Sequence, residues 1–259
     1  IEITLKMHGT SQRTGYLPVL QGYKKTFFDK IFRREGKPIY DWGYVSGTRR
    51  TVLENFEGGY YGSNEFREAH SKFFEGKLNK GEEIFYEVVG FTHTGAPIMA
   101  SGDNKKLNDK DFVKQYGQTT VFSYGCEPTG QRIIDYWDRE KTEPSIIENV
   151  PQSDIYVYRM TMTNEDGFTV EYTPDFMRYR CEQMGVKTVP VMWHGIIPKD
   201  LQTDEFFETD DGEFDDWVYA DNAGEWVKDK AEQYYDGPDP VGKTHVREGV
   251  VVRILNRPK

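Results

Sequence analysis

The sequence has little cysteine and no long apolar run, and both shortages exclude classes of protein. Its 259 residues include only Cys126 and Cys181, which rules out a disulfide scaffold and predicts a reducing compartment. Two cysteines and five scattered histidines show no zinc-site spacing. The apolar runs are only a few residues long, so we expect no membrane span and no membrane partner. No signal peptide is visible, and we expect a cytoplasmic protein, of the cell or of a viral host, with nuclear residence left open.

The sequence does contain enough aromatic and apolar residues for a folded domain. Aromatic residues make up 15% and hydrophobic residues 37% of the chain, too many for a disordered polymer. A chain of this length buries a sizeable core without disulfides or metals. We therefore expect one globular domain over residues 1–259, and a monomer.

Charged residues are unevenly spread along the chain, whose net charge is -10. That total argues against a nucleic-acid partner, but the distribution of charge matters more than its sum. Residues 24–50 contain eight basic and three acidic side chains, whereas residues 203–216 contain eight acidic and no basic ones. We hypothesise that the basic segment holds nucleic-acid phosphates. The alternative is that the basic and the acidic segment are both ordinary charged surfaces exposed to solvent.

Hydrophobic periodicity predicts strands and helices mixed without strict alternation, which is typical of an α+β fold. Residues 1–6 alternate in polarity and should form a strand, with Lys6 on the face opposite Ile3 and Leu5. Residues 10–15 are turn-like. The pattern also predicts strands at 84–91, 155–162, 188–193 and 247–255, and helices at 63–76, 174–185 and 225–235.

Two of the expected helices have an apolar side that should face the core. In residues 63–76 this side consists of Phe66, Ala69, Phe73 and Phe74. A second helix opens at Thr173-Pro174 and closes at Gly185. Its apolar side consists of Phe176, Met177, Cys181 and Met184.

Two short segments in the first third of the chain contain residue types that carry chemistry. The run KMHGTS, residues 6–11, places Lys6 at a strand end before a glycine turn. The run FYEVVG, residues 85–90, sets Glu87 in an otherwise apolar strand, where a ribose hydroxyl would be a suitable partner for the carboxylate. If each segment is considered alone, Lys6 could be an ordinary solvated lysine, and Glu87 an acid that faces solvent.

Two further segments follow in the second half of the chain. The run IYVYR, residues 155–159, belongs to a strand that should place Tyr156, Tyr158 and Met160 on one face, suited to stacking a nucleobase. The run EGVVVR, residues 248–253, brackets a strand with Glu248 for a divalent cation and Arg253 for phosphate. The alternative for residues 155–159 is that the aromatic rings only pack in the core. The alternative for residues 248–253 is an ordinary strand with charged ends.

In this order the four segments resemble the covalent nucleotidyltransferase superfamily, which contains polynucleotide ligases and mRNA capping enzymes. The histidine of KMHGT is similar to the RNA ligase 2 family, as is DPVGKT, residues 239–244, before HVREG. The resemblance extends from Ile1 to Arg253. It implies a nucleotidyltransferase (ligase adenylation) fold of the α+β class, with antiparallel sheets flanked by helices around an ATP cleft.

The resemblance also implies roles for individual residues. Lys6 would become bonded to AMP, and Glu248 would act in catalysis and hold the metal. Glu87 would bind the ribose, and Tyr158 would stack on adenine, with Tyr156 left open as the alternative ring. The implied ATP-binding residues are Lys6, Gly9, Ser11, Arg49, Arg50, Glu87, Tyr158 and Val251.

The chain departs from the family pattern at three places. The stretch between Lys6 and the paired Arg49 and Arg50 is long for the family. Arg159 stands where the family continues with aspartate, and no Lys-x-Lys follows Arg253. We therefore expect a catalytic core that lacks flanking N-terminal or C-terminal segments.

The implied activity is that of an ATP-dependent RNA ligase that uses Mg²⁺ or Mn²⁺. Lys6 would take AMP from ATP and pass it to a 5′-phosphate end, which a 3′-hydroxyl then attacks. RNA ends or a nicked duplex containing RNA would be the partners. A free lysine has a pKa of about 10.4 and needs a cationic or apolar environment to react near neutral pH. A DNA ligase, a capping-type enzyme and a non-catalytic nucleic-acid-binding relative are the alternatives.

Overall fold

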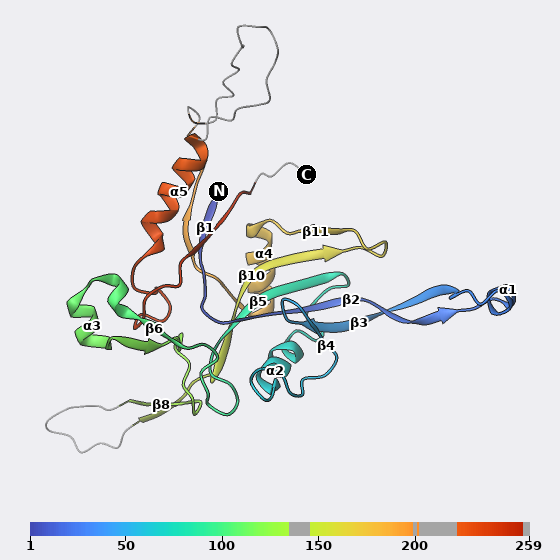
Figure 1. Cartoon of the computed structure of the whole chain (residues 1–259), viewed down its shortest axis with the longest axis horizontal. Coiled ribbons are helices and arrows are strands. Elements are labelled where there is room, and N and C mark those ends of the chain that lie inside the picture. The colour runs from blue at the N-terminus through green and yellow to red at the C-terminus, as the bar shows by residue number, and fades with distance from the viewer. Residues whose placement is uncertain (135–145, 199–200, 202–221, 256–259) are drawn as a thin grey trace, which may run out of the picture. The chain divides into compact units, whose positions relative to one another are not determined.

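The computed structural model describes residues 1–134, 146–198, 201 and 222–255, which form an α+β fold with several antiparallel sheets and few helices (Figure 1). The contacts within the chain divide it into two compact units. Unit 1 comprises Ile1–Met7, Asp103–Thr120 and Val189–Lys259, and unit 2 comprises His8–Gly102 and Val121–Thr188. Among the described helices, none has the length and apolar character needed to cross a membrane. The acidic run at 203–216 lies outside the described residues.

Unit 2 is built on a seven-stranded sheet in the order β11-β10-β5-β2-β3-β4, with β12 beside β10. Among the described pairings of this sheet, β10 with β12 is parallel and the others are antiparallel. The strands are β2 (Thr10–Lys24), β3 (Lys37–Gly47), β4 (Val52–Leu53), β5 (Glu82–Gly90), β10 (Ser153–Thr163), β11 (Thr169–Glu171) and β12 (Lys187–Thr188).

The strands β2 and β3 continue beyond the sheet as a long hairpin that ends at α1 (Phe27–Ile31), as Figure 1 shows. Thr26 begins this helix with a capping box, because its hydroxyl accepts from the Asp29 amide while the Asp29 carboxylate accepts from the Thr26 amide. The pairing of β2 with β3 shifts register between Leu20 and Gly22, which is a β-bulge.

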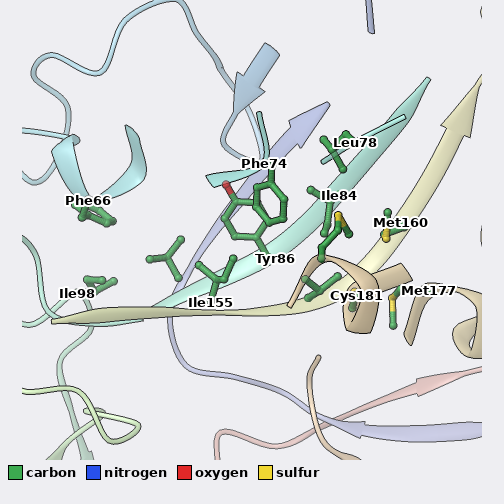
Figure 2. Packing of buried hydrophobic residues seen from close by; sticks show 13 residues of the cluster. Phe66, Phe74, Leu78, Ile84, Tyr86, Ile98, Ile155, Met160, Met177 and Cys181 are labelled. Atoms are coloured by element: carbon green, nitrogen blue, oxygen red, sulfur yellow. The ribbon is translucent and has the colours of Figure 1, made fainter. Parts of the chain in front are cut away.

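The core of unit 2 lies on one face of this sheet (Figure 2). Alternation along β5 turns Ile84, Tyr86 and Val88 toward the core, where all three are fully buried. Side chains from α2 (Glu65–Phe73) and α4 (Pro174–Met184) complete this cluster.

The helices α2 and α4 lie close to the predicted ranges 63–76 and 174–185. Some of the apolar residues that were predicted to face the core are exposed instead. Thr173 and Gly185 cap α4 as predicted, with Gly185 in the left-handed conformation. Met177, Cys181 and Met184 are buried as expected, but Phe176 is 45% exposed. It packs instead against neighbouring rings of Tyr172 and Tyr179 at the surface. In α2, Phe66 is buried, whereas Ala69 and Phe73 are exposed because Arg67 and Ser71 take the inner positions.

Unit 1 contains a three-stranded antiparallel sheet in the order β13-β1-β14. Ile3 and Leu5 of the central strand are buried as the alternation predicted, but Glu2 on the opposite face is buried as well. Trp193 packs edge-on against Trp226. The strands are β1 (Glu2–Leu5), β13 (Val191–His194) and β14 (Val250–Arg253), and the helices are η1 (Asn104–Leu107, 3-10), α3 (Lys110–Tyr116) and α5 (Asn222–Tyr235).

Two small sheets complete the described secondary structure. The strands β6 (Ser101–Asp103) and β7 (Thr119–Val121) form one pair. The strands β8 (Gln131–Ile134) and β9 (Ile146–Asn149) form the other, which is antiparallel.

The turn predicted at residues 10–15 is wrong, because these residues open strand β2. Each of them pairs with β5, from Thr10 opposite Val88 to Gly15 opposite Glu83. Arg13 to Gly15 also pair with β3 on the other side. Hydrogen bonding to two neighbouring strands thus overrides the local preference of a Thr, Ser and Gly segment for a turn.

The predicted shared face of Tyr156, Tyr158 and Met160 is also wrong. The pairing of β10 with β5 shifts register between Val157 and Arg159, so one extra residue is inserted there. Met160 therefore joins Ile155 and Val157 on the core face. A bulge reverses the side-chain alternation that a regular strand would keep.

His70 of α2 makes the stability of unit 2 sensitive to acid. Its ring nitrogen Nε2 lies 2.9 Å from the Ser153 hydroxyl, and burial lowers the pKa of His70 to about 4. The unfolded chain binds a proton near pH 6.5, whereas the folded protein takes it up only near pH 4. Stability should therefore fall by roughly 2–3 kcal/mol as the pH is lowered through that window.

Urea unfolding followed between pH 7.5 and pH 4.5 tests this expectation, with His70→Gln as the comparison. Glutamine still bonds to Ser153 but does not titrate, so its stability should fall less steeply below pH 6.5. Parallel stability curves for the two proteins would contradict a role for His70.

Candidate functional site

The predicted site residues fall into two groups, one in each unit. In unit 1, Lys6 follows β1, and its amide donates to the carbonyl of Gly249. Glu248 comes two residues before β14, which pairs with β1 from Leu5–Val250 to Glu2–Arg253. The antiparallel register thus brings together two residues that are 242 positions apart in the chain. Lys6 Nζ lies 2.5 Å from Glu248 Oε1.

The Lys6–Glu248 pair lies partly in solvent. The Lys6 side chain is 54% exposed, and that of Glu248 is 22% exposed. An ion pair this accessible contributes little to stability, typically up to about 1 kcal/mol.

The segment before β14 is held by α5. The Arg247 guanidinium donates to the carbonyls of Tyr234 at 2.6 Å and Pro238 at 3.0 Å. A Cβ on Gly249 would lie 3.2 Å from the Tyr235 ring, so this residue passes close to the helix. Val251, predicted to cover adenine, is 43% exposed on β14.

Glu248 supplies one carboxylate, and this suits a particular kind of metal binding. Mg²⁺ is usually held by one or two carboxylates together with water and phosphate oxygens. Across the described ranges, no cluster of three His, Cys, Asp or Glu residues is placed to hold an ion. Glu248 is the residue of this group whose carboxylate could hold such an ion.

In unit 2, three neighbouring strands align a row of polar and aromatic residues. Ser11 of β2 is opposite Glu87 of β5, and Glu87 is opposite Tyr156 of β10. The Glu87 side chain lies on the face away from Tyr86 and Val88, because alternate residues of a strand point to opposite faces. Directly opposed residues are close enough for their side chains to act on one ligand.

The two candidate stacking rings have different surroundings. Tyr156 is 5% exposed, lies 6.5 Å from the Tyr124 ring and has Lys187 Nζ 5.6 Å from its centre. Tyr158 occupies the bulge and is only partly buried, and its hydroxyl lies 2.8 Å from the Ser11 hydroxyl. Tyr158 is therefore the more accessible of the two rings.

The environment of Tyr158 contains charges of both signs. Burial raises the pKa of the Tyr158 phenol, and the bond with Ser11 opposes this. The negative charge of Glu87 raises the same pKa further, while Arg159 and Arg49 lower it. Glu87 and Arg49 therefore both lie within electrostatic range of the Tyr158 hydroxyl.

Arg49 and Arg50 lie in the turn between β3 and β4, and both are exposed. The Thr48 hydroxyl organises this turn by accepting from the amides of Arg50 and Thr51. The exposed guanidinium groups are accessible to a phosphate group from solvent.

Gly9 packs directly against the strand that carries Glu87. A Cβ at this position would collide with the Val88 carbonyl oxygen and lie 2.8 Å from Glu87 Cγ. The next residue along, Thr10, begins the pairing with β5. Glycine is therefore needed at position 9 for close approach of the two backbones.

Sequence reasoning missed Arg67, which fixes the segment after Gly9. Arg67 is 4% exposed, and its guanidinium donates to Thr10 Oγ1 at 2.5 Å and to the Ser11 carbonyl at 3.1 Å. In return, Gln12 Nε2 donates to the Arg67 carbonyl at 2.8 Å. Burial lowers the pKa of Arg67, and the Glu87 carboxylate is among the charges that oppose this.

One signal in the sequence could have identified Arg67. It stands one position after Phe66 and seven before the buried Phe74, on the inner side of the helix. A basic residue at a core-facing helical position usually has a dedicated partner. The partners themselves, the Thr10 hydroxyl and the Ser11 carbonyl, could not be predicted from the sequence.

His8, between Lys6 and Gly9 in the chain, is placed by two aromatic residues of unit 2. Its amide donates to the Tyr124 hydroxyl at 2.7 Å, and its ring centre lies 4.1 Å from that of Phe122. These contacts anchor the chain immediately after Lys6. No protein-family model and no curated protein matches this chain.

Proposed function

We propose that this protein is an ATP-dependent RNA ligase with a nucleotidyltransferase fold, in which Lys6 forms a covalent bond to AMP. The AMP is then transferred to a 5′-phosphate end of RNA and displaced by a 3′-hydroxyl. The observation that carries the proposal is the pairing of Lys6 with Glu248 at 2.5 Å. The two residues belong to separate motifs, one expected to supply the nucleophile and the other the catalytic acid, and the register of β1 with β14 makes them neighbours.

The first step requires Lys6 as a neutral amine. The ammonium proton leaves Nζ for solvent, to which the half-exposed side chain has access, because a Glu248 carboxylate that holds the cation is not free to accept it. A bond forms from Nζ to the α-phosphorus of ATP, while the bond from this phosphorus to the bridging oxygen breaks. Pyrophosphate leaves with that electron pair. A divalent cation, when bound at Glu248, offsets the negative charge on the phosphoryl oxygens.

Unit 2 supplies the residues proposed to recognise the nucleoside. The Glu87 carboxylate accepts hydrogen bonds from ribose hydroxyls, and the Tyr158 ring offers a flat apolar face to the base. Tyr158 is preferred to Tyr156 because Tyr156 is almost completely buried. The hydroxyl pair of Ser11 and Tyr158 holds the ring in position.

The guanidinium groups of Arg49 and Arg50 are proposed to contact phosphate. Both are exposed in the turn after β3, and Arg49 acts electrostatically on Tyr158. An arginine binds phosphate through paired N–H groups, which also orients it.

Labelling with ATP and GTP tests the proposal. The protein is incubated with magnesium or manganese and with either nucleotide carrying a radioactive α-phosphate, then denatured and separated on a gel. We expect label from ATP to stay on the protein and label from GTP to be lost. Label from GTP alone would indicate a capping-type enzyme, and no label from either nucleotide would contradict the proposal.

A sealing assay separates the ligases from one another. A nicked duplex is offered with RNA or with DNA on each side of the nick. Sealing that requires RNA at the nick supports the proposal, whereas equal sealing of all-DNA nicks would assign a DNA ligase.

A further inference from the structure

The end of the β2–β3 hairpin, residues 23–40, combines exposed aromatic rings with basic side chains, and we call it the hairpin tip. Phe27, Phe28 and Phe32 are 73%, 67% and 64% exposed. Rings of this size are rarely left in solvent without a binding role when several of them gather in one patch. The tip thus presents an apolar surface that the fold of unit 2 does not use.

The charge of the hairpin tip is opposite to that of the chain as a whole. Residues 24–37 contain six basic and two acidic side chains, although the net charge of the chain is -10. One of the acids, Asp29, is engaged in capping α1, where its carboxylate accepts from the Thr26 amide and hydroxyl. The basic side chains at the tip are exposed. This concentration of positive charge fits a polyanion.

Aromatic and basic side chains are interleaved in the hairpin tip. Lys24 and Lys25 precede the first pair of rings, Lys30 lies on the helix, and the Arg34 guanidinium lies 5.6 Å from the centre of the Phe32 ring. Tyr23 and Tyr40, on the two strands, are also exposed. Unpaired bases stack on such rings while lysine and arginine contact the phosphates between them.

We infer that the hairpin tip binds single-stranded RNA through base stacking on its phenylalanines and phosphate contacts from its basic residues. The choice of RNA over DNA rests on the proposed function. An anionic membrane fits less well, because the apolar residues occupy a single helical turn and the exposed rings continue onto both strands. Interfacial membrane helices present a longer apolar face.

Two variants separate stacking from charge. The first, Phe27→Ala/Phe28→Ala/Phe32→Ala, removes rings that are mostly in solvent and should leave the fold intact. The second, Lys24→Gln/Lys25→Gln/Lys30→Gln/Arg34→Gln, removes four positive charges. Its matched control, Lys105→Gln/Lys106→Gln/Lys110→Gln/Lys114→Gln, removes the same charge from exposed lysines of η1 and α3.

Binding is measured by fluorescence anisotropy of a labelled single-stranded RNA without a 5′-phosphate, in the absence of ATP, over a range of salt concentrations. The aromatic variant should bind about tenfold or more weakly. The charge variant should lower the slope of log affinity against log salt by roughly 2 to 3, at about 0.7 for each phosphate that the protein no longer neutralises. The control variant should bind nearly as tightly as the unchanged protein.

Three outcomes would overturn the inference. They are unchanged binding by both tip variants, an equal loss in the control variant, and binding to vesicles of phosphatidylcholine and phosphatidylserine in place of RNA. Labelling of the tip variants by ATP provides a separate readout. A protein that keeps its label but loses RNA binding supports the inference. If the tip variants lose RNA binding but even the unchanged protein gains no label from ATP, the proposed chemistry is wrong and the inference about the hairpin tip still stands.

Discussion

Replacement of Lys6 by alanine should abolish the gain of one AMP that mass spectrometry detects after incubation with ATP and a divalent cation. The proposed bond forms at Nζ, and alanine has no atom there that can attack phosphorus. Removal of a nucleophile typically lowers the rate by at least about 10³-fold. The exposed Lys6–Glu248 pair contributes little to stability, so the variant should unfold at nearly the same temperature.

A matched lysine elsewhere in unit 1 controls for nonspecific labelling. Lys105 is exposed on η1, and Lys105→Ala should gain AMP as the unchanged protein does. If Lys6→Ala still gains AMP, the nucleophile is another residue and the proposed role of Lys6 is wrong. Peptide mapping of the modified protein would then locate the true site.

Replacement of Arg180 by alanine should destabilise unit 2 by about 3–5 kcal/mol, the usual cost of leaving a buried charge without its partner. The guanidinium of Arg180 donates to both carboxylate oxygens of Glu82, at 2.8 and 2.7 Å. Glu82 is 1% exposed and also accepts from the Tyr172 hydroxyl and the Asn79 amide. Burial alone would raise the pKa of Glu82, but these hydrogen bonds more than offset it and the pKa is lowered.

Arg178, on the same helix, provides the control. It pairs with Asp175, whose side chain is 89% exposed, so Arg178→Ala should cost no more than about 1 kcal/mol. Urea unfolding near neutral pH measures both variants. The expectation fails if Arg180→Ala costs as little as Arg178→Ala, since the Glu82 carboxylate would then tolerate burial without its guanidinium.

The local parts of the fold could be predicted because their signals lie within a few residues. Thr173, Pro174 and Gly185 mark both ends of α4, since a hydroxyl cap and a left-handed glycine act on the neighbouring backbone. Alternation placed Lys6 opposite Ile3 and Leu5. The same local reasoning failed at residues 10–15, where two partner strands decide the conformation. It also failed at Met160, because a bulge depends on the partner strand.

By itself the sequence determined the α+β class, the approximate positions of eight of the helices and strands, and the motif residues for which roles are proposed. The eight are β1, β5, β10, β13, β14, α2, α4 and α5. Only the tertiary structure decided that Lys6 meets Glu248, that Arg67 binds the Thr10 hydroxyl and the Ser11 carbonyl, and that Tyr158 is more accessible than Tyr156. The physical reason is range. Capping and side-chain alternation act over a few residues, whereas these contacts depend on strand register and helix packing between segments far apart in the chain.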